Sequence, residues 1–263
     1  SKSDISPPGA VLLARQVDNP SEFGVCAFNS EGELIDEIFE QVKEAFPNLP
    51  DPTASILSPG VYKNNDLTNT KYYTGTLDNG LKYFFVEDSK TESSAIEVIV
   101  NIGSKYNPEG YDGLAHFLEH MLFMGRDGGD SGSGFTQKIT QHGGYTNAYT
   151  TDDQTCYNYS ITTDKFIDFI DEFIDFFLKP KFDIKYIEKE INAVNNEHNM
   201  YMPLLGWKVN HLWKEFYSKK TPLSRFTTGT INTLTDGGNR TFEELRKVLV
   251  DFFEKYYGGN CMT

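Results

Sequence analysis

Residues 113–125 read GLAHFLEHMLFMG, and this stretch decides both the local fold and the kind of site that the chain can form. Its pattern predicts a helix over 114–124. On a helix that turns about 100° per residue, His116 and His120 lie about 40° apart, and Glu119 lies close to both. Two imidazoles can therefore bind one metal ion, with a carboxylate beside them. The HxxEH spacing is the inverse of the HExxH motif of zinc peptidases and predicts a zinc site.

A second helix is expected to complete this site, because a catalytic zinc usually has three protein ligands and one open position. The helix predicted over 183–200 offers Glu188, Glu190, Glu197 and His198. Glu190 and Glu197 lie two turns apart and share a face, whereas Glu188 points elsewhere and is expected in solvent. From the residues alone, the third ligand is either Glu190 or Glu197.

The rest of the chain predicts an α+β fold, with a mixed and mostly antiparallel sheet covered by helices on one face. The turn Asp78-Asn79-Gly80 favours a hairpin. The expected strands are Tyr72–Leu77, Leu81–Glu87, Ser94–Ile102, Tyr145–Thr151 and Thr155–Thr162. The expected helices, besides those above, are a short one between the glycine-rich loop 127–134 and His142, a deeply buried one from Asp164, and two over 204–218 and 241–257. The last of these has a capping-box pattern at Thr241 and Glu244.

Residues 1–69 differ from the remainder in their many prolines. Ser30 and Glu33 form a capping-box pattern, and apolar residues follow at helical spacing until Pro47. We therefore expect an N-terminal extension with one helix over 1–69, followed by a main domain over 70–263.

The composition excludes several classes of function. The 263 residues carry 24 Lys+Arg against 38 Asp+Glu, a net charge of −14, which argues against a nucleic-acid partner. No apolar run approaches the roughly 20 residues that span a bilayer, and no secretory signal is visible, so we expect a cytoplasmic protein without a membrane partner. Three cysteines without a CxxC pair argue against a disulfide framework and a thiolate zinc site.

Three motifs together resemble one family. GLAHFLEHMLFMG (113–125), GGYTNAYTTDDQTCYNY (143–159) and EINAVNNEHNMYM (190–202) are similar, in order and spacing, to the N-terminal region of the pitrilysin/insulinase zinc metallopeptidases. The similarity continues into PLSRFTTGT (222–230). It implies that 70–263 is the catalytic domain of an insulinase-like zinc metalloendopeptidase that hydrolyses small peptides.

The resemblance also implies roles for individual residues. It makes His116, His120 and Glu197 the ligands of one zinc ion per chain, and Glu119 the general base. Glu197 follows His120 by 77 residues, the spacing of the family's glutamate ligand, so the resemblance selects it over Glu190. Glu190 then becomes a supporting carboxylate of the catalytic site.

For the peptide substrate, the resemblance implies edge-strand hydrogen bonds at Asn147 and Ala148, and side-chain pockets lined by Phe123 and Trp207. The remaining histidines, His142, His198 and His211, are expected to be surface residues or hydrogen-bonded core residues.

Family members are built from four homologous domains, so the resemblance implies that the remaining domains of a longer chain are partners of this one. The oligomeric state stays open. Two alternatives stay open as well, namely a catalytically silent subunit or scaffold and one subunit of a heterodimeric processing peptidase. The presence of His116, Glu119, His120 and Glu197 argues against a silent relative.

Overall fold

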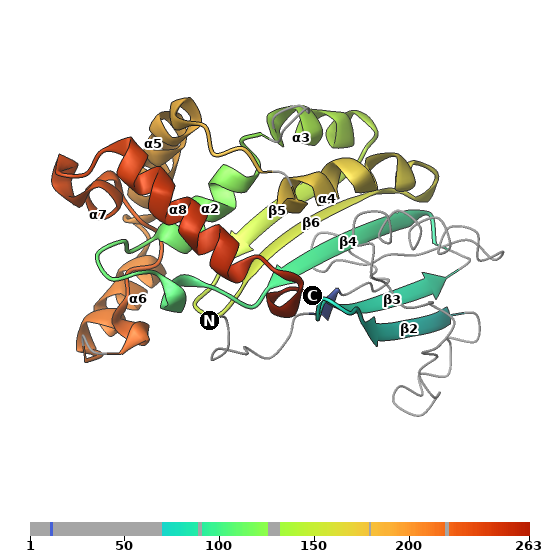
Figure 1. Cartoon of the computed structure of the whole chain (residues 1–263), viewed down its shortest axis with the longest axis horizontal. Helices are drawn as coiled ribbons and strands as arrows, with labels where there is room; N and C mark the ends of the chain where they lie inside the picture. The colour runs from blue at the N-terminus through green and yellow to red at the C-terminus, as the bar shows by residue number, and fades with distance from the viewer. Residues whose placement is uncertain (1–10, 13–69, 89–90, 126–131, 179, 219–220) are drawn as a thin grey trace.

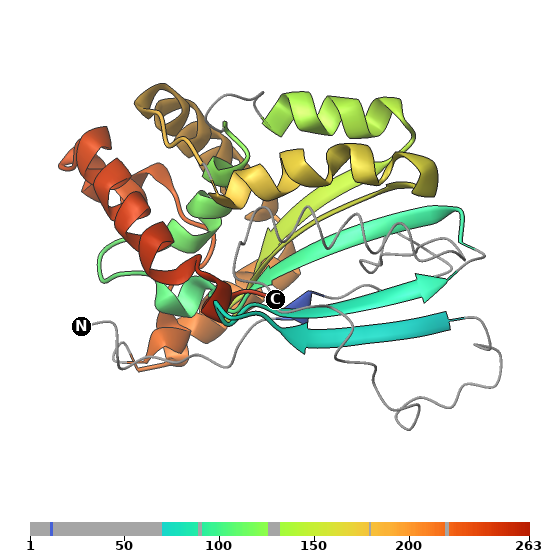
Figure 2. The ribbon, with the colours of Figure 1, turned by 45° about the vertical axis from the view of Figure 1, so that its right-hand side comes forward.

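The computed structural model of the chain describes residues 11–12, 70–88, 91–125, 132–178, 180–218 and 221–263 (Figure 1). Within them the strands form two three-stranded sheets, and helices lie on one side of the second sheet (Figure 2). The predicted α+β class is therefore confirmed. The helix predicted after Ser30 lies outside the described residues, so the division at residue 69 stays a prediction.

The first sheet contains the predicted hairpin. Strands β2 (Thr70–Thr76) and β3 (Lys82–Asp88) pair antiparallel across a turn in which Gly80 adopts a φ of +87°. Only glycine adopts this backbone conformation without strain. On the other side of β3, the two residues of β1 (Val11–Leu12) pair in parallel with it, a contact too short to leave a sequence signal.

The second sheet has the order β4-β6-β5 and is antiparallel throughout. Its strands are β4 (Ser93–Val100), β5 (Tyr145–Thr150) and β6 (Thr155–Thr162). Thr263 exchanges two backbone hydrogen bonds with Ile99, of 2.7 and 2.8 Å, so the last residues occupy the outer edge of β4. Among the described residues, β5 pairs only with β6, which leaves its outer edge open.

The turn between β5 and β6 is held by side chains from two other parts of the chain. Asp152 Oδ1 accepts hydrogen bonds from Ser104 Oγ and from Lys214 Nζ, both at 2.9 Å. Lys105 Nζ lies 2.6 Å from Asp153 Oδ1. Lys214 is only 7% exposed, so the ion pair of Lys214 with Asp152 fixes the turn against the helix that carries Lys214.

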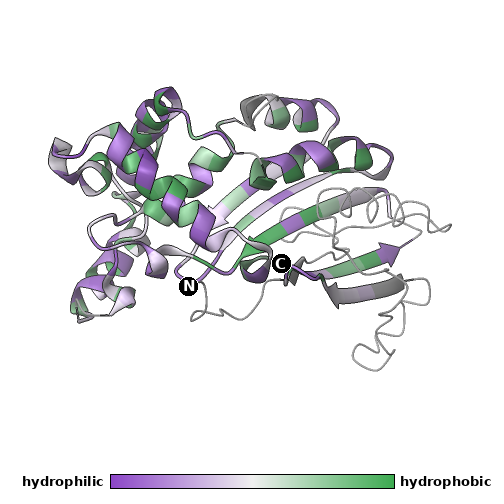
Figure 3. Ribbon diagram, viewed as in Figure 1, coloured by the Kyte–Doolittle hydropathy of each residue, from purple (hydrophilic) through white to green (hydrophobic). Residues whose placement is uncertain are grey.

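Two helices cover one face of the second sheet, α3 (Gly132–Gln141) and α4 (Ile170–Leu178). Phe135 of α3 packs against Tyr159 of β6 and Phe173 of α4, with ring centroids 5.7 and 6.0 Å apart. Figure 3 shows that most of β4 is hydrophobic as well. The core of the domain therefore lies between this sheet and its helices.

Two predicted helix starts are wrong. The helix α3 begins at Gly132, inside the stretch that we expected to be a loop. The helix expected from Asp164 begins only at Ile170, after two 3-10 turns. The Phe166 carbonyl accepts a hydrogen bond of 2.9 Å from Tyr159 Oη and a 3-10 hydrogen bond of 3.4 Å from the Phe169 amide.

The other helices of the described residues form the second part of the domain around the HxxEH segment. They are α2 (Leu114–Leu122), α5 (Ile184–Tyr201), α6 (Leu205–Phe216), α7 (Ile231–Thr235) and α8 (Phe242–Tyr256). The predicted capping box of Thr241 and Glu244 begins α8, and α2 packs against α5. Among the described residues, no helix has both the length and the apolar character required to cross a membrane.

Candidate metal centre

The helix α2 is anchored before its two histidines begin. Asn107 Oδ1 accepts a hydrogen bond of 2.8 Å from the Ala115 amide, one of the free donors of the first turn. Gly113 precedes the helix with a φ of +91°, and a Cβ added there would lie 2.1 Å from the Cα of Gly229. These two glycines let the segment that contains Thr228 pass directly over the start of α2.

Three side chains converge from α2 and α5. One ligand atom each from His116, His120 and Glu197 lies within 4.8 Å of the others. Glu197 Oε2 is 3.6 Å from His116 Nε2 and 3.3 Å from His120 Nε2. The two helices that the sequence predicted to form the site therefore do meet, and the glutamate whose carboxylate faces both Nε2 atoms is Glu197.

Hydrogen bonds fix which nitrogen of each imidazole faces the centre. His116 Nδ1 lies 2.6 Å from the Thr228 carbonyl, and a carbonyl oxygen only accepts, so Nδ1 carries the proton. His120 Nδ1 lies 3.4 Å from Glu190 Oε2, which orients that ring in the same way. The Nε2 atoms of both rings are left to bind a metal ion beside the carboxylate. Two imidazole nitrogens and one carboxylate oxygen are ligands that zinc takes in catalytic sites, so these residues fit zinc.

The electrostatics of the cluster also favour a cation. Burial alone would lower the pKa of His120, but hydrogen bonds with Glu190 and Glu197 outweigh this effect and raise the pKa to about 9. The hydrogen bond with His120 holds the pKa of Glu197 below its usual value. Both shifts show that the carboxylates of Glu190 and Glu197 stabilise positive charge where the three ligand atoms meet.

Glu119 lies beside the three ligands and is not one of them. It is only 8% exposed, and burial raises the pKa of its carboxyl group. Thr150 Oγ1 donates a hydrogen bond of 2.6 Å to Glu119 Oε2. A carboxyl group with a raised pKa beside a metal site can accept and return a proton near neutral pH.

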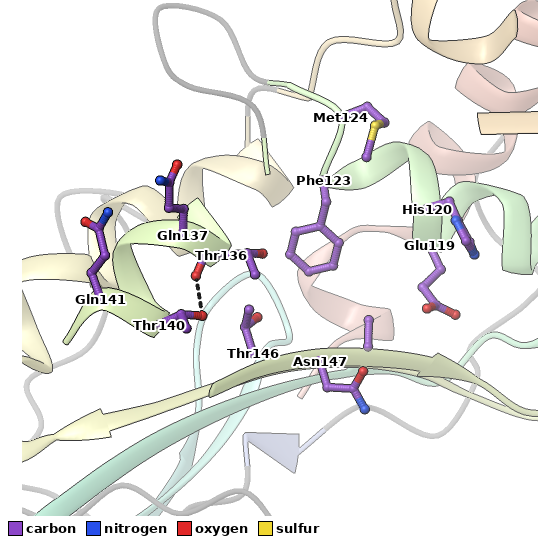
Figure 4. Close-up of a pocket in the computed structure, with 11 residues that line it drawn as sticks. Glu119, His120, Phe123, Met124, Thr136, Gln137, Thr140, Gln141, Thr146 and Asn147 are labelled. Atoms are coloured by element: carbon purple, nitrogen blue, oxygen red, sulfur yellow. Dashed lines mark hydrogen bonds between the residues drawn. The ribbon is translucent and has the colours of Figure 1, made fainter. Parts of the chain in front are cut away.

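A cavity of about 740 Å³ extends from Glu119 and His120 between α3 and β5 (Figure 4). Phe123 borders it and packs against the rings of Tyr157 and Phe176. Asn147 and Ala148 line it from β5, where the Asn147 side chain lies on the opposite side of the strand from Thr146 in Figure 4. Any contact between Asn147 and a ligand at this face therefore involves its backbone.

The remaining predicted residues lie elsewhere. Trp207 is half-buried on α6, in ring contact with Tyr201 and His211, and does not line this cavity. His198 stacks against His211 with ring centroids 5.6 Å apart, and neither belongs to the cluster of metal-binding atoms. Glu188 is exposed, as its position on the helix predicted.

Sequence reasoning missed two residues that touch the site. Thr228 acts through its backbone carbonyl, which leaves no signal in the residue type. Thr150 stands in the quoted segment 143–159, yet only the crossing of β5 and α2 places its hydroxyl at Glu119. Neither contact is visible without the tertiary structure.

Together, a pair of histidines one turn apart, a glutamate from a second helix and a buried carboxylate beside them define the class of the protein. This class is the zinc metallopeptidases with an inverted HxxEH motif.

Comparison with known proteins places the chain within this class. Residues 83–222, more than half of the chain, match the family described as Insulinase (Peptidase family M16). The chain therefore belongs to the insulinase family of zinc metallopeptidases.

Its relatives are much longer proteins. The chain is 34% identical to "Insulin-degrading enzyme-like 2" of Arabidopsis thaliana over 73% of its own length and 20% of the relative. It is 32% identical to the insulin-degrading enzyme of Drosophila melanogaster over 86% of its own length and 23% of the relative. The crystal structure of pitrilysin superimposes with a TM-score of 0.71 at 32% identity, covering 78% of this chain and 22% of pitrilysin. The chain thus spans about a fifth of the length of these relatives.

Proposed function

We propose that the chain acts as the zinc-binding catalytic domain of a metalloendopeptidase that hydrolyses small peptides, within a longer multidomain protein. The observation that carries the proposal is the position of Glu119, which lies in one cavity with His120 and with the open edge of β5. We assign residues 70–263 to this domain and residues 1–69 to an N-terminal extension. The insulin-degrading enzymes among the relatives support a peptide as the substrate.

Three residues hold the zinc ion in this proposal, namely His116 and His120 through Nε2 and Glu197 through a carboxylate oxygen. A zinc ion supplies a Lewis acid that polarises the substrate carbonyl and lowers the pKa of water to about 7. Glu190 contributes indirectly, since its carboxylate accepts the Nδ1 proton of His120 and keeps that ring in the orientation and tautomer that binding requires.

Glu119 performs the proton transfers. Its carboxylate accepts a proton from the attacking water, and the water oxygen forms the new bond to the carbonyl carbon of the substrate. It then returns this proton to the amine nitrogen as the peptide bond breaks, so that the base ends in its starting state. Glu119 is buried and lines the same cavity as His120, where both transfers take place.

The substrate is held as an additional strand. An extended peptide pairs with the open edge of β5 through the backbone of Asn147 and Ala148, beneath the polar side chains of α3. Phe123 receives a side chain next to the cleaved bond, since it borders the same cavity. Trp207 stays in the proposal as a second pocket residue, on the strength of the family resemblance alone.

Two variants test the proposal. Glu119→Gln is expected to retain stoichiometric zinc and to lose at least two orders of magnitude in kcat, because the general base is gone. His120→Ala is expected to lose zinc. The matched control is Glu188→Gln, since Glu188 is exposed and lies on the same helix as Glu197. Near-normal turnover of a zinc-loaded Glu119→Gln enzyme would show that another residue takes the proton.

A catalytically silent subunit or scaffold is the main alternative. Such a protein has no need of a buried carboxylate beside the ligands or of an open strand edge in the same cavity. Hydrolysis of any peptide that depends on Glu119 distinguishes the two functions.

A further inference from the structure

The hydroxyl of Thr150 is the only side-chain group for which the structure shows a hydrogen bond to Glu119 within the described residues. We propose that Thr150 is a positioning residue for the general base, which fixes the Glu119 carboxylate so that Oε1, and not Oε2, exchanges the proton. This inference rests on the proposed function. Its geometric basis is the 2.6 Å contact from Thr150 Oγ1 to Glu119 Oε2.

The direction of this hydrogen bond follows from the neighbours of Thr150. Its hydroxyl has one proton and two possible acceptors, Glu119 Oε2 at 2.6 Å and Thr155 Oγ1 at 3.4 Å. Thr155 Oγ1 donates its own proton to the Ile102 carbonyl at 2.9 Å. A hydrogen bond to a carboxylate is shorter and stronger than one between two hydroxyls, so the Thr150 proton points to Glu119.

This arrangement divides the work of the two carboxylate oxygens. Oε2 accepts from Thr150 in each protonation state of Glu119, because the hydroxyl has no closer acceptor. The proton from the attacking water then goes to Oε1, and from Oε1 to the leaving amine. Without the hydroxyl, the carboxylate is free to turn about its last torsion angle, and its productive orientation is populated only part of the time.

Thr150 also connects the base with the proposed substrate strand. It lies on β5 two residues after Ala148, and the side chains of both point to the same side of the strand. The turn that follows β5 is held by Lys214 and Ser104 through Asp152. A peptide paired with β5 is therefore placed relative to Glu119 by one short and anchored strand.

The test compares Thr150→Val, which keeps the shape of the side chain and removes the hydroxyl, with Thr150→Ser, which keeps the hydroxyl. In the complete zinc-loaded protein, we expect Thr150→Val to lower kcat on one fluorogenic peptide about ten- to hundredfold, the effect of losing a hydrogen bond to a charged group. KM and zinc affinity are expected to stay within a factor of about three, and Thr150→Ser is expected to recover most of kcat. Thr162→Val, an exposed threonine at the end of β6, is the control.

A readout independent of turnover is the orientation of Glu119 in a crystal structure of Thr150→Val, where we expect the carboxylate to leave its wild-type position. An unchanged Glu119 orientation, or a kcat within twofold of wild type, would overturn the positioning role. A raised KM at unchanged kcat would instead make Thr150 a peptide contact and would also overturn it. Failure of the proposed function is distinct, since it appears as full turnover of Glu119→Gln whatever Thr150→Val does.

Discussion

Replacing Gly113 by alanine is expected to weaken zinc binding although the residue lies outside the metal site. Gly113 and Gly229 touch where the segment before α7 crosses the start of α2. A Cβ at Gly113 would lie 2.1 Å from Gly229 Cα and 2.4 Å from Gly229 N. Non-bonded carbon atoms rest about 3.5–4.0 Å apart, so the crossing segment must retreat by more than roughly 1 Å.

The expected loss of zinc affinity follows from a contact that this segment makes with His116. The Thr228 carbonyl, one residue before Gly229, accepts the 2.6 Å hydrogen bond that sets the tautomer of His116. Losing a hydrogen bond that orients a metal-binding histidine typically lowers metal affinity about 10- to 100-fold. The φ of +91° at Gly113 adds a folding cost of about 1–2 kcal/mol for any residue with a Cβ.

Competition titration with a zinc chelator measures the affinity, and thermal unfolding measures the stability. Gly229→Ala is expected to have a smaller effect, because its Cβ would lie 3.1 Å from Gly113 Cα. Gly206→Ala on α6 is the matched control, since a Cβ there meets nothing within 4 Å. Zinc affinity of a folded Gly113→Ala protein within twofold of wild type would refute the link between the glycine contact and His116.

Three further predictions concern the ligands, the fold and the proposed longer protein. Glu197→Gln removes a ligand and is expected to lower zinc affinity by several kcal/mol. Glu190→Gln removes only the hydrogen bond to His120 and is expected to lower zinc affinity about 10- to 100-fold. Both are measured by the same competition titration, and equal effects would contradict their different roles. Thr241→Ala removes the capping box of α8 and is expected to lower the unfolding free energy by about 1 kcal/mol in denaturant titrations. The isolated chain is expected to bind zinc but to cleave a fluorogenic peptide at least about a hundredfold more slowly than the complete protein, because a lone strand edge positions the substrate poorly. Equal kcat/KM values would contradict this last prediction.

Local signals predicted the parts of the fold that depend on local chemistry. The turn at Gly80 and the capping box at Thr241 are where the sequence places them, because each is determined by residues within a few positions. The predicted start of α4 was wrong because residues 163–169 form two 3-10 turns, in which the Phe166 carbonyl accepts from the Phe169 amide and from the Tyr159 hydroxyl. Apolar residues at helical spacing do not distinguish such 3-10 turns from the first turns of an α-helix.

The choice between Glu190 and Glu197 shows the same limit within the site. Helical spacing correctly indicated that both glutamates face α2, and the structure places both against His120. One meets Nδ1 and the other Nε2. This difference depends on how α5 crosses α2, so the residues alone left the choice open and only the family spacing resolved it.

The anchored turn after β5 has a mechanical consequence. Asp152 is held by Ser104 and Lys214, directly after the end of the strand, whereas the other end follows the Gly143-Gly144 turn. β5 pairs with β6 along its whole length, and the end beside Glu119 is held in addition by these buried side-chain contacts, so we expect that end to be the more rigid one. Among the β5 amides that are hydrogen-bonded to β6, exchange should be slower near Thr150 than near Tyr145, and a peptide paired with the strand would be held most rigidly beside Glu119.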